Sequence, residues 1–350
     1  MLDHDRLTRR RFVGNAAVTV AGLGGASVLL SACGDDEAGS ATAGSTSPQA
    51  ASLTVVNILP PQLGYAAEYI ADIDGHFERE GVKVSVETAR GSAPAIQSVL
   101  SGKALLSRVG MLESLIHIAN EGAPIVNVGQ QTRLSPLAIV SSPENPLRTP
   151  QDLKGQTIGI PSEGGTSENT LNILVAKAGL TEDDVPRQVT GFSPGTYELI
   201  RNGRIDGFII GATQIAQMEA AIPEAVFLRT ADHVTDGEIY ITSGRQLEDN
   251  KDTIAAYLRA VRAASNQIVD DEGFEDTLAK LRSRYDFDEL KDDEVAKPWL
   301  EFLVEAWTVD GREEILKIAP EKWQDVYAEA AQIGAIEEQI DPGESIVQVL

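Results

Sequence analysis

The sequence predicts an α/β protein with two lobes and a helical C-terminal segment. Three observations lead to this fold class. Alternating strand and helix patterns run from Leu53 to about Leu228, and such βα repeats form mostly parallel sheets. One helix–strand pattern occurs twice, at residues 100–110 and 200–211. From Asp249 onward the pattern is almost entirely helical.

The expected strands are short aliphatic segments bounded by proline, glycine or polar residues. Residues 53–59 alternate in the manner of a strand and end at Pro60-Pro61, and a helix follows from about Tyr65. The later strands are expected at residues 82–88, 105–109, 125–129, 156–161, 188–191, 208–210 and 225–228, with helices between them. In the C-terminal segment four aromatic residues have a spacing that predicts inward packing: Trp299, Phe302, Trp307 and Trp323.

The repeated pattern favours two similar lobes over one long sheet. In each copy a helix ends at a glycine (Gly102, Gly203), a short strand follows, and a second glycine opens the next loop (Gly110, Gly211). The spacing between the glycines is identical in the two copies. The alternative is the ordinary repetition of βα units that any α/β protein shows.

The N-terminus has the features of an export signal. The basic segment TRRRFV at residues 8–13 precedes an uncharged stretch that ends with Leu30-Ser31-Ala32-Cys33. A positive region, an apolar region and small residues before a cleavage point are typical of a signal peptide, and the paired arginines resemble the twin-arginine type. We therefore expect a signal peptide over residues 1–32. The alternative is a transmembrane anchor, but several polar residues and glycines dilute the apolar run.

Cys33 is the only cysteine of the chain, so the sequence offers no disulfide framework. The LSAC segment resembles a bacterial lipobox, which predicts lipidation of Cys33 at the mature N-terminus. Residues 33–52 are rich in Ala, Gly, Ser, Thr and acidic residues and predict a flexible tether. The expected location is therefore outside the cytoplasm, either on the outer face of the cell membrane or in the periplasm. The N-terminal lipid is expected to be the only attachment to the membrane.

The charge and the motifs exclude several function classes. A formal net charge of −24 argues against nucleic acid and anionic lipid surfaces as partners. No G-x-S-x-G motif, P-loop or Rossmann fingerprint is present, and the four histidines lack metal-ligand spacing. We expect no catalytic residue, metal or cofactor. The acidic runs 270–272 and 292–294 are interpreted as solvated helix faces, with calcium binding as the alternative.

Four segments resemble solute-binding proteins of the nitrate/sulfonate/taurine type, which include binders of thiamine-precursor pyrimidines. Residues 71–84 are similar to the GxFxxEGLxV motif, residues 91–102 to the second helix, and residues 152–167 to the entry into the second lobe. Residues 202–208 are similar to the GxxDA element. Two departures are that Leu105 replaces a usual aspartate and His76 replaces a usual aromatic residue, whereas Asp206 keeps the acidic position in the other lobe.

The resemblance implies a type II periplasmic-binding-protein-like fold, with ligand in the cleft between two lobes. It places lobe 1 at residues 53–132 plus 240–350 and lobe 2 at residues 133–239. It also implies a monomer that delivers a small solute to the permease of an ABC importer, and through it to the ATPase. The solute class stays open between an anion, such as a sulfonate or nitrate, and a neutral planar ring of the pyrimidine type. A same-fold enzyme and an orphan ligand-sensing lipoprotein are the alternative functions.

The expected ligand-binding residues follow strand ends, where such sheets offer polar groups. The first-lobe candidates are Gln62, Gly64, Tyr65, Gly110, Met111, Gln130 and Gln131. The second-lobe candidates are Gly165, Thr166, Ser167, Gly211 and Thr213. The start of the helix at Thr166 predicts either a site for an oxyanion or carbonyl, or only a well-capped helix. Three arginines are the cationic candidates: Arg90, Arg108 and Arg133.

Overall fold

The computed structural model describes residues 50–161, 163, 166–191 and 193–350. They belong to one compact unit, Ser47–Leu350. The expected signal peptide, the lipidation site Cys33, most of the tether and Gly165 lie outside the described residues.

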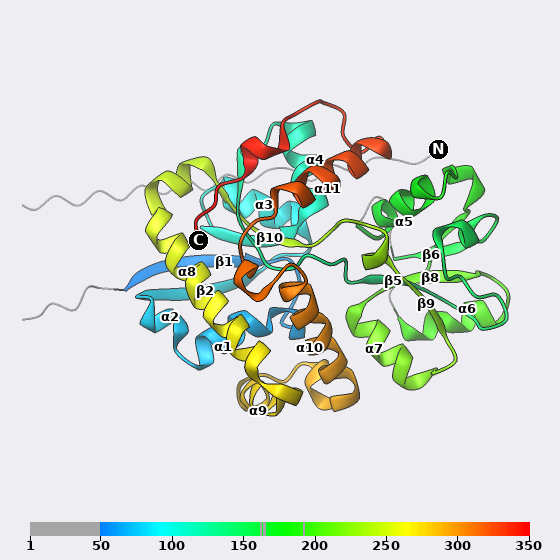
Figure 1. Ribbon diagram of the computed structural model, residues 1–350, viewed down its shortest axis with the longest axis horizontal. Coiled ribbons are helices and arrows are strands. Elements are labelled where there is room, and N and C mark those ends of the chain that lie inside the picture. Colours follow the sequence, from blue (N-terminus) through cyan, green and yellow to red (C-terminus); the bar gives the residue numbers. More distant parts are fainter. Residues whose placement is uncertain (1–49, 162, 164–165, 192) are drawn as a thin grey trace, which may run out of the picture. The chain divides into compact units, whose positions relative to one another are not determined.

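The first sheet has five strands in the order β2-β1-β3-β10-β4. Its strands β1, β2 and β10 are labelled in Figure 1. Its strands are β1 (Ala51–Asn57), β2 (Val82–Thr88), β3 (Leu106–Gly110), β4 (Ile125–Gln130) and β10 (Glu238–Ser243). β1 pairs in parallel with β2 and β3, whereas β10 lies antiparallel between β3 and β4. Leu53 and Val55 of β1 alternate onto one buried face, as the period of two in the sequence predicts.

The second sheet also has five strands, in the order β7-β6-β8-β5-β9. Its strands are β5 (Leu137–Ser141), β6 (Ile158–Ile160), β7 (Arg187–Val189), β8 (Gly207–Gly211) and β9 (Val226–Arg229). β6 is parallel to β7 and β8, and β5 is antiparallel to β8 and β9. We call the first sheet with its helices the first lobe and the second sheet with its helices the second lobe. The predicted α/β fold with two sheets is confirmed.

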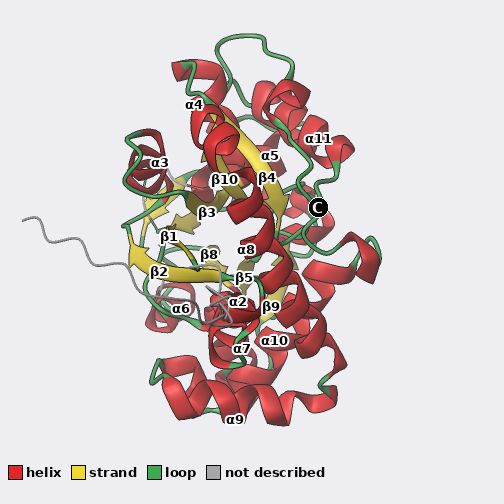
Figure 2. Cartoon of the chain, turned by 90° about the vertical axis from the view of Figure 1, so that its left-hand side faces the viewer, coloured by secondary structure: helices red, strands yellow, loops and turns green. Residues whose placement is uncertain are grey.

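Helices cover both sheets, as Figures 1 and 2 show. The first lobe carries α1 (Ala66–Ile73), α2 (His76–Arg79), α3 (Ser92–Leu100), α4 (Met111–Glu121), α8 (Gly244–Asp270), α9 (Glu275–Arg284), α10 (Asp293–Thr308) and α11 (Pro320–Gln332). The second lobe carries α5 (Thr166–Lys177), α6 (Tyr197–Arg201) and α7 (Ala212–Ala221). α7 packs against α10 of the first lobe, and α11 packs against α4 and α5.

The repeated sequence pattern folds in the same way in both lobes. α3 ends before Gly102, β3 follows, and Gly110 precedes α4; α6 ends before Gly203, β8 follows, and Gly211 precedes α7. Gly102 and Gly203 have φ angles of 77° and 64°, in the left-handed region that favours glycine after a helix.

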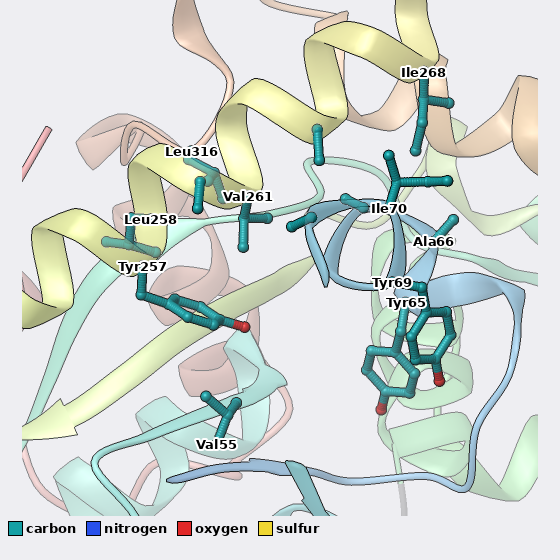
Figure 3. Close-up of a cluster of buried hydrophobic side chains, with 14 of the residues drawn as sticks. Val55, Tyr65, Ala66, Tyr69, Ile70, Tyr257, Leu258, Val261, Ile268 and Leu316 are labelled. Atoms are coloured by element: carbon teal, nitrogen blue, oxygen red, sulfur yellow. The ribbon is translucent and has the colours of Figure 1, made fainter. Parts of the chain in front are cut away.

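The first-lobe core lies between the sheet and α1, α8 and α10. In Figure 3, Tyr257, Leu258 and Val261 of α8 lie over the same core as Ala66 and Ile70 of α1. The C-terminal aromatics pack inward as predicted: Trp299, Trp307 and Trp323 are buried, and Phe302 is half-buried. Because α8, α10 and α11 return to cover this lobe, the chain ends in the lobe in which its described part begins.

The chain passes between the sheets twice, and the two crossings lie side by side. The amides of Gln131 and Thr132 donate to the Glu238 carbonyl at 2.8 and 3.2 Å, and the Glu238 amide donates to Thr132 Oγ1 at 2.9 Å. A Cβ at Gly237 would lie 2.1 Å from the Thr132 carbonyl oxygen, so only glycine allows this approach. The expected lobe boundaries at 132–133 and 239–240 remain a prediction, and these crossings support them.

None of the helices that the structure describes is long and apolar enough to cross a membrane.

Candidate functional site

A cavity of about 330 Å³ lies where the strand ends of the first sheet meet α10 and the start of α7. First-lobe residues come from the loop after β1, from β3 and β10, and from α10. Second-lobe residues come from the start of α7 and the segment that leads into β5. The lining residues are Leu59, Gln62, Gly64, Tyr65, Arg108, Thr132, Leu134, Pro136, Leu137, Gly211, Ala212, Thr213, Gln214, Glu238, Trp299, Phe302 and Leu303.

Five of the sequence-predicted ligand residues line this cavity: Gln62, Gly64, Tyr65, Gly211 and Thr213. The residues that do not line it are Gly110, Met111, Gln130, Gln131, Thr166 and Ser167. For all of them, contact with a ligand remains a prediction.

Tyr65 forms part of the first-lobe wall, at the turn between β1 and α1. Its ring is buried, and its hydroxyl accepts a hydrogen bond from the Leu59 amide at 3.3 Å. Burial raises the pKa of this phenol, so the hydroxyl stays protonated. The ring therefore offers an apolar surface with a neutral polar edge.

Arg108 is the basic residue of the described lining, and its charge is already paired. Nη1 donates to the Gly64 carbonyl at 2.8 Å and to Glu68 Oε1 at 3.0 Å, and Nη2 donates to Glu238. The guanidinium also lies 5.0 Å from the Tyr65 ring centroid. Burial by itself would lower the pKa of Arg108. The negative charges of Glu238 and Glu68 raise this pKa well above its ordinary value. Two carboxylates around one guanidinium leave this part of the wall acidic.

The start of α7 forms the second-lobe wall. Gly211 is the N-cap of α7, and Thr213 follows in the first turn. Thr213 Oγ1 donates to Glu289 Oε1 of the first lobe at 3.2 Å. A first-lobe carboxylate therefore lies at this helix start, where an anionic ligand group would otherwise be favoured.

The start of α5 meets a carboxylate in the same way. Thr166 Oγ1 donates to Glu113 Oε1 of α4 at 2.5 Å, and Ser167 is buried beside it. Glu113 also folds back over the start of its own helix, since a Cβ at Gly110 would lie 2.1 Å from Glu113 Oε2. Burial raises the pKa of the Glu113 carboxyl, and the hydrogen bond from Thr166 opposes that shift.

The glutamines at the first crossing are buried. Gln130 Nε2 donates to Met111 Sδ and to the Thr132 carbonyl, both at 3.4 Å, and Gln130 Oε1 accepts from the Ala319 amide at 3.1 Å. The side-chain amide of Gln131 has no hydrogen-bond partner within the described part of the chain. Gln130 and Met111 therefore support the crossing rather than face the cavity.

The other two cationic candidates have different surroundings. Arg90 is exposed. Arg133 is buried and holds the segment that follows α10: Nη2 donates to the Lys317 carbonyl at 2.7 Å, and Nε pairs with Asp310 at 3.0 Å. Arg133 is thus committed to the crossing between the lobes.

A buried acid lies beside the second crossing. Asp236 Oδ1 accepts from the Gly237 amide at 2.8 Å. Burial and the nearby Glu113 raise the pKa of Asp236 well above its ordinary value.

Among the described residues no cluster of His, Cys, Asp and Glu has the arrangement of a metal site.

Trp299 and Phe302 of α10 complete the aromatic wall. Their rings stack with centroids 5.4 Å apart and an interplanar angle of 28°. Trp299 Nε1 is buried and has no hydrogen-bond partner among the described residues.

The comparisons with known proteins decide the family. The family model described as NMT1/THI5 like matches residues 62–272, more than half of the chain. The chain belongs to the NMT1/THI5-like family. The match begins at Gln62 and contains both crossings and the start of α7. Of the residues that line the cavity, only Leu59 and those of α10 lie outside the match.

Two curated relatives illustrate the range of this family. The chain is 28% identical over 156 residues to the riboflavin-binding protein RibY of Chloroflexus aurantiacus. The aligned segment covers 44% of each of the two proteins. It is 25% identical over 217 residues to the 4-amino-5-hydroxymethyl-2-methylpyrimidine phosphate synthase of Schizosaccharomyces pombe, covering 58% of this chain and 61% of that protein. The chain thus spans about half the length of these relatives.

Solved structures show the fold. The aliphatic sulphonate binding protein SsuA from Escherichia coli has a TM-score of 0.63 at 18% identity, covering 86% of this chain and 93% of that one. The nitrate-binding protein NrtA from Synechocystis has a TM-score of 0.59 at 14% identity, covering 85% of each chain. The chain has the fold of periplasmic solute-binding proteins, as the sequence resemblance implied.

Sequence reasoning missed part of the cavity wall. Trp299 and Phe302 were expected to pack inward, and the structure places them against the cavity. Glu238 and Glu68, which pair Arg108, were not singled out. The sequence does contain one signal for these two glutamates, which is an arginine within a buried strand. A buried arginine needs carboxylates nearby to compensate its charge.

Proposed function

We propose that this chain is the extracytoplasmic solute-binding component of an ABC importer. It captures a small solute between its lobes and delivers the solute to a permease. The family, the periplasmic solute-binding fold and the cavity with walls from both lobes support this proposal. The export signal and the lipobox support attachment through lipid on Cys33.

We further propose that the solute is a neutral planar ring rather than a small anion. The observation that carries this choice is the pairing of the Arg108 charge with two carboxylates. In addition, Glu289 and Glu113 lie against the starts of α7 and α5, where an oxyanion would bind. The wall instead offers the aromatic surfaces of Tyr65 and Trp299, which suit a ring.

A thermal-shift and calorimetry screen tests the ligand class. Neutral pyrimidines and flavins are expected to raise the melting temperature, because a ligand that binds only the folded state stabilises it. Nitrate and alkanesulfonates are expected to leave it unchanged. Tight binding of a sulfonate with no effect from any neutral ring would contradict the proposal.

Two tryptophans of α10 provide a matched pair of variants for the ligand that the screen finds. Trp299 and Trp307 both have buried Nε1 atoms without a partner among the described residues, but only Trp299 lines the cavity. Trp299→Phe should weaken binding by about two- to tenfold, since the smaller ring loses part of an aromatic contact worth about 0.5–1.5 kcal/mol. Trp307→Phe should leave affinity unchanged. If both variants changed the ligand affinity equally, the ligand would not bind in this cavity.

A same-fold enzyme is the second candidate, because the yeast relative carries the name of a synthase. Mass spectrometry of a stoichiometric mixture separates the two functions. A binding protein returns the solute unchanged after long incubation, whereas an enzyme converts it. An orphan ligand-sensing lipoprotein would bind the solute without a permease partner, which reconstitution with the importer tests.

A further inference from the structure

The first lobe contains a second cavity, of about 230 Å³, that the proposed transport function does not use. It lies between β1 and β2 on one side and α1, α2, α8 and the residue after α9 on the other. It shares no lining residue with the inter-lobe cavity. The lining residues are Asn57, Pro61, Glu68, Tyr69, Asp72, Phe77, Val84, Val86, Thr88, Tyr257 and Tyr285.

Four aromatic rings form much of its wall. Tyr69 and Tyr285 have ring centroids 4.3 Å apart, and Phe77 and Tyr257 stack at 5.2 Å. Figure 3 shows Tyr69 on α1 and Tyr257 on α8, so these two rings come from separate helices. The faces that the paired rings leave uncovered carry negative potential and attract cations that approach within about 6 Å.

The charged groups of the wall are both acidic. Asp72 is exposed at the edge and lies 3.4 Å from Arg284, whereas Glu68 is only 6% exposed. Glu68 Oε1 accepts from Arg108 and from the Tyr240 hydroxyl. Glu68 Oε2 has no hydrogen-bond partner within the residues that the structure describes. Glu68 and Glu238 share the single positive charge of Arg108, so this part of the wall carries net negative charge, which favours a cation over a neutral ligand.

We propose that this cavity is a second binding site, for a small organic cation such as a protonated amine or a quaternary ammonium group. The aromatic rings of Tyr69, Phe77, Tyr257 and Tyr285 surround the cation, and Glu68 and Asp72 supply the compensating charge. The site belongs to the first lobe alone, so it does not depend on closure of the lobes or on the solute of the inter-lobe cavity.

Choline is the probe, and its neutral analogue with a tert-butyl group in place of the trimethylammonium group is the chemical control. Both have the same shape, so calorimetry on the full chain isolates the contribution of the charge. We expect choline to bind at least about tenfold more tightly than the neutral analogue. Equal affinity, or no heat of binding for choline, would overturn the proposal.

Two exposed valines on edge strands give a matched pair of variants. Val86 of β2 is 54% exposed and lines the cavity, and Val189 of β7 is 55% exposed in the second lobe. Val86→Trp should place an indole at the cavity entrance and abolish choline binding, whereas Val189→Trp should leave it unchanged. Circular dichroism checks that both variants fold.

The inter-lobe variant Trp299→Phe separates this site from the transport site. It should leave choline affinity unchanged even if the proposed importer function is wrong. Loss of choline binding in Trp299→Phe, with retention in Val86→Trp, would place the cation in the inter-lobe cavity and overturn the proposal.

Discussion

At the residue scale, Arg108 determines much of the character of the inter-lobe cavity. It is 1% exposed and paired with Glu68 and Glu238. Removing Arg108 would leave both carboxylates without a counter-charge, and breaking such a buried pair costs about 3–5 kcal/mol. The carboxylates that keep Arg108 stable in the interior therefore also withhold it from a ligand anion.

Gly237 carries a residue-scale prediction. Its φ angle is not in the left-handed region, but an added Cβ would lie 2.1 Å from the Thr132 carbonyl oxygen. Gly237→Ala must push the two crossings apart, because a backbone oxygen cannot turn away as a side chain can. We expect a loss of about 1–3 kcal/mol in the free energy of unfolding, measured by urea denaturation.

Gly244 is the control for this prediction. It opens α8, and a Cβ there would meet only Val126, at 4.0 Å. Gly244→Ala should therefore be neutral or slightly stabilising. If both variants lose the same stability, the close approach of the crossings is not what requires glycine at residue 237.

At the element scale, the first turns of α5 and α7 both point at first-lobe carboxylates, which makes the role of Thr166 testable. Thr166→Val keeps the side-chain shape but removes the hydroxyl that donates to Glu113 across the lobes. A hydrogen bond to a charged group is worth about 1.5–3 kcal/mol, so loss of this contact should lower ligand affinity by about tenfold or more. Calorimetry with the cognate solute measures this change.

Thr181 is the control for Thr166, because it caps a helix without contacting the other lobe. It caps the short helix at Glu182–Asp184 and bonds Asp184 at 2.9 Å, with no contact to the first lobe among the contacts of the described residues. Thr181→Val should cost about 0.5–2 kcal/mol of stability and leave affinity unchanged. Wild-type affinity in Thr166→Val as well would make the start of α5 only a well-capped helix.

Most strands of the two sheets could be predicted from the sequence, but β5 and β10 could not. Both are antiparallel strands inside their sheets, and all of β5 and nearly all of β10 is buried. A short run such as LAIVS, buried on both faces, has no alternation that separates it from a buried helix segment. β5 and β10 each follow one of the two crossings, so their positions depend on contacts between distant parts of the chain.

The first-lobe loop of the site was predictable because it follows a strand that the sequence shows clearly. Gln62, Gly64 and Tyr65 come directly after residues 53–59 and line the cavity. Trp299 reaches the same wall from more than two hundred residues further along, through the packing of α10 against α7. Hydrophobic spacing predicts that such a residue packs inward, but it cannot say against which wall.

At the scale of the whole molecule, the lobes meet through a small set of contacts away from the crossings. α7 packs against α10, α5 packs against α11 with an ion pair between Lys177 and Glu329, Thr213 bonds Glu289, and Thr166 bonds Glu113. The crossings themselves are held by backbone hydrogen bonds and by Arg133. Rotation about the crossings would separate the first set of contacts and leave the second intact, which is the geometry of a hinge.

We therefore expect the molecule to become more compact when the solute binds. The solute touches both lobes only when they are closed, so its binding favours the closed state, whereas the two threonine hydrogen bonds add only a few kcal/mol between them. Small-angle X-ray scattering should show a smaller radius of gyration at saturation, with binding confirmed by calorimetry on the same sample. The double variant Thr166→Val/Thr213→Val should start from a larger radius without solute and still become compact when solute binds. An unchanged radius in both proteins at saturation would contradict closure about the two crossings.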